Sequence, residues 1–309
     1  MPPLPLPDEA RPGADLDGTA PDGTAPDGAA GEDVLPGVRP SPNAWYHPDA
    51  YALENAHVDP DRRVDAVLRE VAGWAGLDVV DVGCGLGVML GRLAGLDPGP
   101  GEDAAAAARG AARSVVGVEP HPPLRERAQR RALALDPAGA RVRVVAGTAQ
   151  ALPLPDASVD VVLARWAYFF GPGCEPGLAE AERVLRPGGA VVVVDTDASR
   201  STFGGWFSRA RPRHDAAAVR RFWRRQGFSE RGVDVRWAFP DRASFEAVVR
   251  VELPPALADE VLAAHPGTAL DDAVAVRWRR TPGRPGSAPA DPAAGPADDP
   301  AGAAVGGRA

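Results

Sequence analysis

The sequence predicts an α/β fold built on a doubly wound, mostly parallel sheet. Three observations lead to this prediction. Apolar segments typical of buried strands alternate with amphipathic segments typical of helices, a glycine-rich turn follows the first strand, and two segments of alternating polarity lie late in the chain. Ligands of such sheets bind outside the carboxyl ends of the strands, so we expect the functional site at that edge.

The predicted elements follow one another in a regular order. Residues 61–75 carry apolar side chains at helical spacing and predict a packed helix before the first strand. Residues 98–112 are rich in Gly, Pro and Ala and predict an inserted loop with a small helix. Strands one to five are expected at residues 79–82, 114–118, 142–146, 159–164 and 191–194.

The last third of the foldable chain predicts a helix at residues 215–227, with Asp215 as its N-cap. Residues 233–239 and 274–278 alternate between apolar and polar side chains, which predicts strands six and seven. Helices are expected between these strands, at residues 242–250 and 255–264.

Both ends of the chain are predicted to be disordered. Residues 1–42 contain a near-repeat of Asp-Gly-Thr-Ala-Pro, and residues 281–309 are mostly Ala, Pro and Gly. Such segments bury too little apolar surface to offset the loss of chain entropy. Residues 43–280 are expected to form one domain with a substantial core.

The formal net charge of −8 belongs mainly to the predicted tails, since residues 1–40 contribute −6 and residues 281–309 contribute −1. The remaining domain is nearly neutral, so no general affinity for nucleic acid follows. Residues 200–225 hold eight arginines and one acid, Asp215. We interpret this stretch as a solvated helix face, with a basic patch for an anionic substrate as the alternative.

Composition also narrows location and cofactor chemistry. The chain contains no run of 18 apolar residues, and its first residues are prolines and acids, so we expect a cytoplasmic protein without membrane insertion. Two cysteines provide no disulfide framework. The five histidines show no paired spacing typical of metal ligands, and no metal site is predicted.

The glycine-rich turn carries most of the functional information. Gly83, Gly85 and Gly87 follow an apolar strand, and glycines there let a ligand lie against bare backbone. A dinucleotide-binding G-x-G-x-x-G pattern would need glycine at position 88, which is Val88. The turn is therefore expected to bind something other than a dinucleotide.

The D-x-G-x-G-x-G run from Asp81 to Gly87 resembles motif I of class I S-adenosylmethionine-dependent methyltransferases of the type 11 group. Later blocks follow in the order that this family shows: Glu119 after strand two, Gly147 to Pro155 after strand three, and Val184 to Gly189 before strand five. We interpret the last block as a structural turn. The resemblance spans about residues 43–280 and implies a Rossmann-like seven-stranded sheet with an antiparallel terminal hairpin, the class I methyltransferase fold.

The resemblance implies a set of cofactor-binding residues. Asp81 and the glycine turn would hold the methionine and ribose side, Glu119 the ribose diol, and Thr148 with Ala149 the adenine. Thr148 stands where the family usually has Asp, and His121 would pack near the adenine or be exposed. The cofactor-binding residues expected from the resemblance are Asp81, Gly83, Cys84, Gly85, Gly87, Glu119, Pro120, Thr148, Ala149 and Arg165.

The acceptor side is expected beyond strands four and five. Trp166, Tyr168 and Trp206 are candidates for the substrate pocket, because aromatic faces attract a sulfonium or a cationic acceptor; core packing is the alternative reading. An N-terminal lid containing Asn43, Trp45, His47 and Tyr51 is expected to close the site. The weak catalytic candidates are His47, Tyr51 and Asp197, and Asp197 also fits a solvated loop acid.

These features predict methyl transfer to oxygen, nitrogen or carbon of a small molecule by in-line displacement, in which positioning supplies much of the acceleration. Three alternatives stay open: a nicotinamide-dependent oxidoreductase, a non-catalytic S-adenosylmethionine-binding protein, and an RNA-docking surface at residues 200–225. Nucleic acid is not the expected partner. The acceptor and the oligomeric state do not follow from the sequence.

Overall fold

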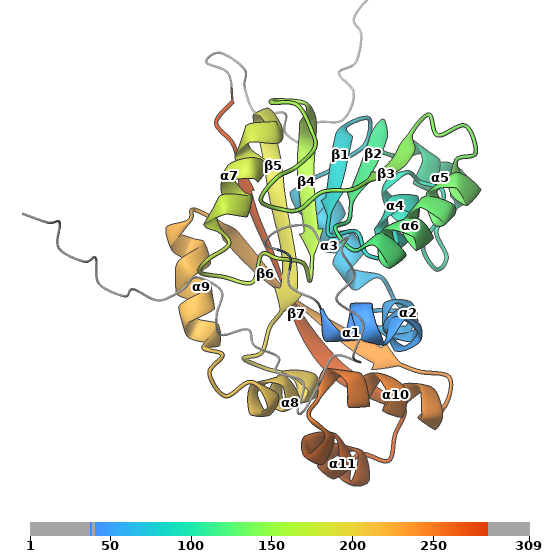
Figure 1. The fold of residues 1–309 in the computed structure, drawn as a ribbon, viewed down its shortest axis with the longest axis vertical. Helices are drawn as coiled ribbons and strands as arrows, with labels where there is room; N and C mark the ends of the chain where they lie inside the picture. The colour runs from blue at the N-terminus through green and yellow to red at the C-terminus, as the bar shows by residue number, and fades with distance from the viewer. Residues whose placement is uncertain (1–37, 39–40, 284–309) are drawn as a thin grey trace, which may run out of the picture.

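The computed structural model describes residue 38 and residues 41–283, and it contains one seven-stranded sheet with the strand order β3-β2-β1-β4-β5-β7-β6 (Figure 1). Strands β1 to β5 are parallel, and β7 runs antiparallel between β5 and β6. The predicted fold class is confirmed. The strands are β1 (Asp78–Val82), β2 (Ser114–Val118), β3 (Val142–Val145), β4 (Val159–Arg165), β5 (Leu185–Thr196), β6 (Ser229–Ala238) and β7 (Ala269–Arg280).

Helices cover both faces of this sheet, which is why its central strands are apolar on both sides. One core cluster joins the sheet to α3, α4 and α6, and a second joins the opposite face to α7 and α9. The helices are α1 (Pro42–Tyr46), α2 (Pro48–His57), α3 (Arg63–Val71), α4 (Val88–Leu93), α5 (Ala104–Arg109), α6 (Pro122–Leu135), α7 (Glu175–Val184), α8 (Thr202–Ala210), α9 (Ala216–Arg225), α10 (Arg242–Glu252) and α11 (Pro255–Ala264).

Strand β5 is longer than the sequence predicts, beginning at Leu185 rather than at residue 191. Leu185 pairs with Val159, and the register then shifts before Val161 pairs with Ala190. The Pro-Gly-Gly segment that we interpret as a turn is therefore an irregular part of the strand. A Cβ on Gly189 would lie 2.8 Å from the Asp160 carbonyl oxygen, so this irregularity requires glycine.

The inserted segment before β2 contains the expected small helix, α5. At the other end of the chain, the Thr281 N–H donates to the Gly189 carbonyl at 2.8 Å, and the Gly188 N–H donates to the Pro282 carbonyl. Residues 281 and 282 therefore hydrogen-bond to β5, just beyond the predicted boundary at residue 280. The remainder of both tails predicted to be disordered lies outside the described residues.

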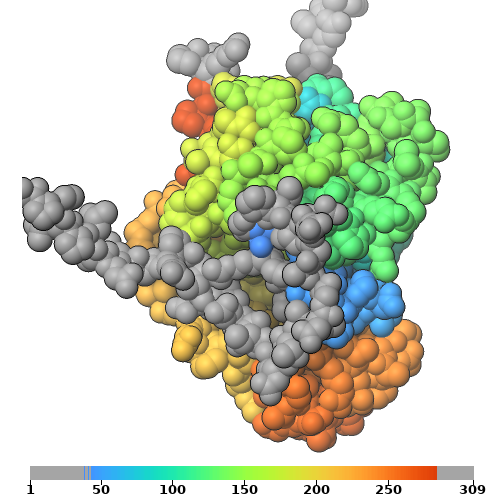
Figure 2. Space-filling model, viewed as in Figure 1, coloured from blue at the N-terminus to red at the C-terminus, as the bar shows by residue number. Residues whose placement is uncertain are grey.

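A third core cluster lies beyond the sheet proper and is built from α8, α10, α11 and the adjoining ends of β6 and β7. The N-terminal helices α1 and α2 contact α10, so segments from opposite ends of the domain meet there. Figure 2 shows the segment containing α1 and α2, in blue, directly beside the orange region that contains α10. This region adjoins the carboxyl ends of the parallel strands (Figure 1).

Candidate functional site

The glycine turn begins directly after β1, and all three of its glycines adopt left-handed backbone conformations, with φ of +71° at Gly83, +54° at Gly85 and +71° at Gly87. A Cβ on Gly83 would lie 2.4 Å from the Ala167 Cβ, and a Cβ on Gly85 would lie 2.5 Å from the Tyr51 hydroxyl. The backbone conformation and these close approaches both disfavour a side chain at Gly83 and Gly85. The turn therefore presents bare backbone at the carboxyl end of β1.

Glu119 follows β2 and places its carboxylate against this turn. The side chain is buried, Oε2 accepts a hydrogen bond from the Gly85 N–H at 2.8 Å, and Oε1 accepts one from the His121 N–H at 2.9 Å. Burial raises the pKa of Glu119, and the two backbone donors oppose that shift. A carboxylate held in this position is suited to accept hydrogen bonds from vicinal hydroxyl groups.

Asp81 lies near the end of β1 and Arg165 at the end of the neighbouring strand β4, and their charges influence each other. Burial raises the pKa of Asp81 to about 7, with Arg165 lowering it and Glu119 raising it further. Arg165 donates through Nη1 to the Met89 sulfur at 3.1 Å, and its Nε is buried with no hydrogen-bond partner among the described residues. The site thus contains one guanidinium with unused donor capacity.

The residues expected around the adenine lie on the loops after β2 and β3. Thr148 and Ala149 are buried, and Thr148 forms an isolated bridge with Ala151. His121 stacks on Trp45 of α1 with ring centroids 3.9 Å apart and planes 8° from parallel. The Pro120 carbonyl accepts a hydrogen bond from Arg125, and the buried Cys84 sulfur lies under the turn, against Gly117 of β2.

The N-terminal lid reaches the glycine turn through Tyr51 and reaches His121 through Trp45. Tyr51 on α2 places its hydroxyl over Gly85, and burial, with contributions from Glu54 and Glu119, raises its pKa above the ordinary value. His47 is exposed between α1 and α2. Of the two residues expected to close the site, Tyr51 contacts the glycine turn, whereas His47 has an exposed side chain.

The loop after β4 places Trp166 at the carboxyl edge and turns Tyr168 away from it. Both residues have left-handed φ values, +46° and +50°, which are unfavourable for bulky side chains and often mark functional sites. Trp166 donates from Nε1 to Thr196 Oγ1 at 3.3 Å, at the end of β5. The Tyr168 ring packs on α7, where a Cβ on Gly177 would lie 2.5 Å from it.

The two remaining candidates also have other partners. Trp206 lies on α8 and packs edge-on against His265, with ring centroids 5.7 Å apart. Asp197 accepts hydrogen bonds from Ser199 and pairs with Arg200 at 3.1 Å; burial opposes ionisation, but these bonds leave its pKa below the ordinary value. A carboxylate stabilised in this way is a weak base.

Two acidic residues that the sequence did not indicate, Glu54 and Glu252, hydrogen-bond to Asn43 of the lid. Asn43 donates from Nδ2 to Glu54 Oε2 at 3.2 Å and to Glu252 Oε1 at 2.8 Å. The only sequence signal is that Glu54 lies three residues after Tyr51 and so shares its helix face. Glu252 has none, because it approaches Asn43 only through the tertiary contact between α1 and α10.

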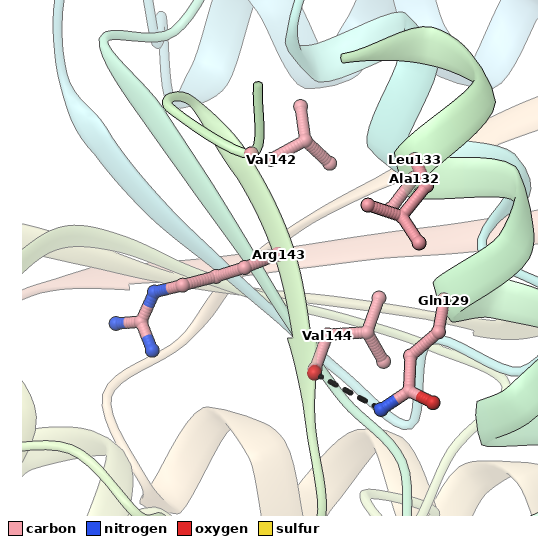
Figure 3. Close-up of a pocket in the computed structure, with 7 residues that line it drawn as sticks. Gln129, Ala132, Leu133, Val142, Arg143 and Val144 are labelled. Carbon is pink, nitrogen blue, oxygen red and sulfur yellow. Dashed lines mark hydrogen bonds between the residues drawn. The ribbon is translucent and has the colours of Figure 1, made fainter. Parts of the chain in front are cut away.

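A separate depression lies between α6 and the edge strand β3 (Figure 3). Gln129 donates from its amide to the Val144 carbonyl at 3.5 Å there, and the Arg143 side chain points away from the helix (Figure 3). None of the predicted site residues lines it. Its lining residues are Gln129, Ala132, Leu133, Gly139, Val142, Arg143 and Val144.

Membrane-spanning helices and metal-binding side-chain groups are both absent from residue 38 and residues 41–283. No helix in that part of the chain is both long and apolar enough to cross a bilayer. The same residues contain no group of three or more His, Cys, Asp or Glu side chains placed to hold a metal ion.

The sequence of this chain is similar to those of known methyltransferases. Residues 80–193 match the model of a family described as "Methyltransferase domain". A 55-residue segment is 46% identical to the ubiquinone/menaquinone biosynthesis C-methyltransferase UbiE of Methylobacterium nodulans, covering 18% of this chain and 22% of that relative. This segment thus covers less than a quarter of the relative's length.

The chain is also similar to solved structures, at low sequence identity. The YcgJ protein of Bacillus subtilis is 16% identical, with 71% of this chain and 98% of that chain covered and a TM-score of 0.46. The [4+2]-cyclase SpnF is 20% identical, with coverages of 72% and 82% and a TM-score of 0.47. Residues 80–193 thus match a methyltransferase domain, and the seven-stranded sheet to which they contribute has the class I methyltransferase fold.

Proposed function

We propose that this chain binds S-adenosylmethionine at the glycine turn and transfers a methyl group to oxygen, nitrogen or carbon of a small-molecule acceptor by in-line displacement. The observation that carries the proposal is the bare backbone of Gly83 and Gly85 next to the buried Glu119 carboxylate. When bound, the cofactor supplies a methyl group already activated by its positively charged sulfur. The chain therefore has mainly to position the acceptor and exclude water.

The residues present fit such a cofactor. Glu119 is an acceptor-only group when ionised, with lone pairs beyond the two used by backbone N–H groups, so it can also receive ribose hydroxyls. Arg165 retains an unpaired buried Nε. In this proposal Tyr51 and Trp45 cover the site and reduce the access of water to it.

A calorimetric titration with S-adenosylmethionine and S-adenosylhomocysteine tests the proposal. Glu119→Gln and Glu119→Ala should weaken both ligands by about tenfold or more, because a charged hydrogen-bond partner is lost. Glu126→Gln is the matched control, since Glu126 is exposed on α6 and pairs with Arg130. Absence of binding to the wild-type chain would overturn the proposal, and binding of NAD instead would favour the oxidoreductase alternative.

A further inference from the structure

Arg165 is the last residue of β4, and its guanidinium lies against the helix that follows the glycine turn. Its Nη1 is 3.1 Å from the sulfur of Met89 on α4, and its guanidinium carbon is 5.2 Å from the centre of the Trp166 ring. Its Nε is buried and has no hydrogen-bond partner in the part of the chain that the structure describes. A thioether is a weak acceptor, so most of the donor capacity of this guanidinium is unused.

The acidic groups around Arg165 do not supply the missing partner. Arg165 forms no ion pair with the residues that the structure describes. Asp59 is near enough for Arg165 to lower its pKa, but its two oxygens accept backbone N–H groups of Arg63 and Val64, each at 2.9 Å. Burial raises the pKa of Asp81 to about 7 in spite of Arg165. Because buried charged donors normally have a partner, an anionic oxygen is the group that Arg165 lacks.

The order of the strands places Arg165 and Glu119 on opposite sides of the glycine turn. The turn follows β1, which lies between β2 and β4, while Glu119 follows β2 and Arg165 ends β4. Arg165 shares a sheet face with Asp81, because Asp81 pairs with Leu163, two residues before Arg165. A ligand whose diol is held by Glu119 therefore has to cross the turn before it reaches Arg165.

S-adenosylmethionine has a single anionic group, the carboxylate of its amino-acid end, whereas its ammonium and sulfonium groups are positive. We infer that Arg165 binds this carboxylate and thereby sets the direction in which the cofactor lies across the glycine turn. The inference rests on the proposed function. A guanidinium can donate two parallel hydrogen bonds to a carboxylate. Asp81, on the same face and opposite in charge, suits the ammonium group of the same end.

A purely structural role of Arg165 leads to a different expectation. If its guanidinium only offsets the charge of Asp81, replacing it disturbs the turn and weakens every ligand of the turn alike. If it binds the carboxylate, its replacement weakens only ligands that carry this group. Two ligands that differ in the carboxylate alone therefore distinguish the two roles.

Calorimetric titration of the full chain with S-adenosylhomocysteine and with decarboxylated S-adenosylhomocysteine tests the inference. Both ligands contain the adenine, the ribose, the thioether and the amine. The wild-type chain should bind S-adenosylhomocysteine at least about tenfold more tightly, since the other ligand lacks the charge-assisted hydrogen bonds. Arg165→Met should weaken S-adenosylhomocysteine about tenfold or more and should not weaken the decarboxylated ligand.

Arg143→Met is the matched control and should change neither affinity, because Arg143 is exposed on the edge strand β3 and points away from α6 (Figure 3). Equal affinity of the wild-type chain for the two ligands would overturn the inference, as would an equal loss of both in Arg165→Met. Either result leaves the proposed function standing. If S-adenosylhomocysteine does not bind the wild-type chain at all, the proposed function fails and the inference fails with it.

Discussion

Two buried carboxylates beside the glycine turn differ in what surrounds them. Glu119 accepts hydrogen bonds from two backbone N–H groups, whereas the charges that act on Asp81 are Arg165 and Glu119. Backbone donors stabilise an ionised carboxylate, and burial stabilises the protonated form. Burial consequently raises the pKa of Asp81 to about 7.

Replacing Asp81 by asparagine should stabilise the fold. The Asp81 pKa is raised from 3.8 to about 7, so the folded chain binds this proton more tightly, and the free energy of unfolding falls as pH rises between these values. We expect Asp81→Asn to increase the free energy of unfolding at pH 8 by up to about 4 kcal/mol, and by less at pH 5. Urea unfolding at both pH values measures the change, and an equal effect at both would contradict it.

At the scale of elements, the lid formed by α1 and α2 joins the glycine turn to α10. Trp45 stacks on His121, and Tyr51 covers Gly85. Asn43 donates hydrogen bonds to the carboxylates of Glu54 and Glu252. The contacts of α2 and α1 with α10 hold this lid against the sheet. Cofactor binding is therefore expected to depend on the position of the lid.

Two substitutions in the lid should have opposite outcomes. Tyr51→Phe removes a buried hydroxyl beside Gly85 and should weaken S-adenosylhomocysteine binding about three- to tenfold, the effect of one lost hydrogen-bonding group. His47→Ala alters an exposed side chain and should leave the affinity unchanged. Calorimetric titration of both variants compares them, and a larger effect of His47→Ala would show that the lid closes differently.

How far the sequence predicts each element depends on whether its signal is local. Strands β1 and β2 are apolar on both faces, and the glycines and Glu119 follow them directly, so the fold and the position of these residues at the carboxyl edge were predictable. Glu252 is 209 residues from Asn43, and only tertiary packing brings them together. Tyr168 and Trp206 show the same limit, since an aromatic residue after a strand or on a helix gives no sign of the side on which it packs.

At the scale of the whole molecule, half of the eight arginines between residues 200 and 225 form ion pairs with acidic side chains. Arg200 pairs with Asp197 and Asp234, and Arg209 pairs with Glu260. Arg220 and Arg221 also pair with acidic side chains. The solvated-face interpretation fits these pairs better than a basic patch, because the paired arginines have their positive charge offset by a neighbouring acid.

RNA binding should accordingly be weak and non-specific. Fluorescence anisotropy with a single-stranded RNA of about 20 nucleotides should show at most binding at low salt that disappears near 0.15 M, since few phosphate contacts are available. The matched control is a DNA oligonucleotide of the same length, which should behave alike. Sequence-dependent binding that persists at 0.15 M would restore the docking-surface alternative.

Asn43, Glu54 and Glu252 belong to α1, α2 and α10, outside the sheet. The glycine turn and Glu119 instead follow strands β1 and β2 of the sheet. Substitutions in the lid and α10 therefore leave the glycine turn and Glu119 in place, so the two groups of residues can change independently of each other. An exchange of the lid and α10 between related chains is a transplant that keeps the recipient's own glycine turn and Glu119.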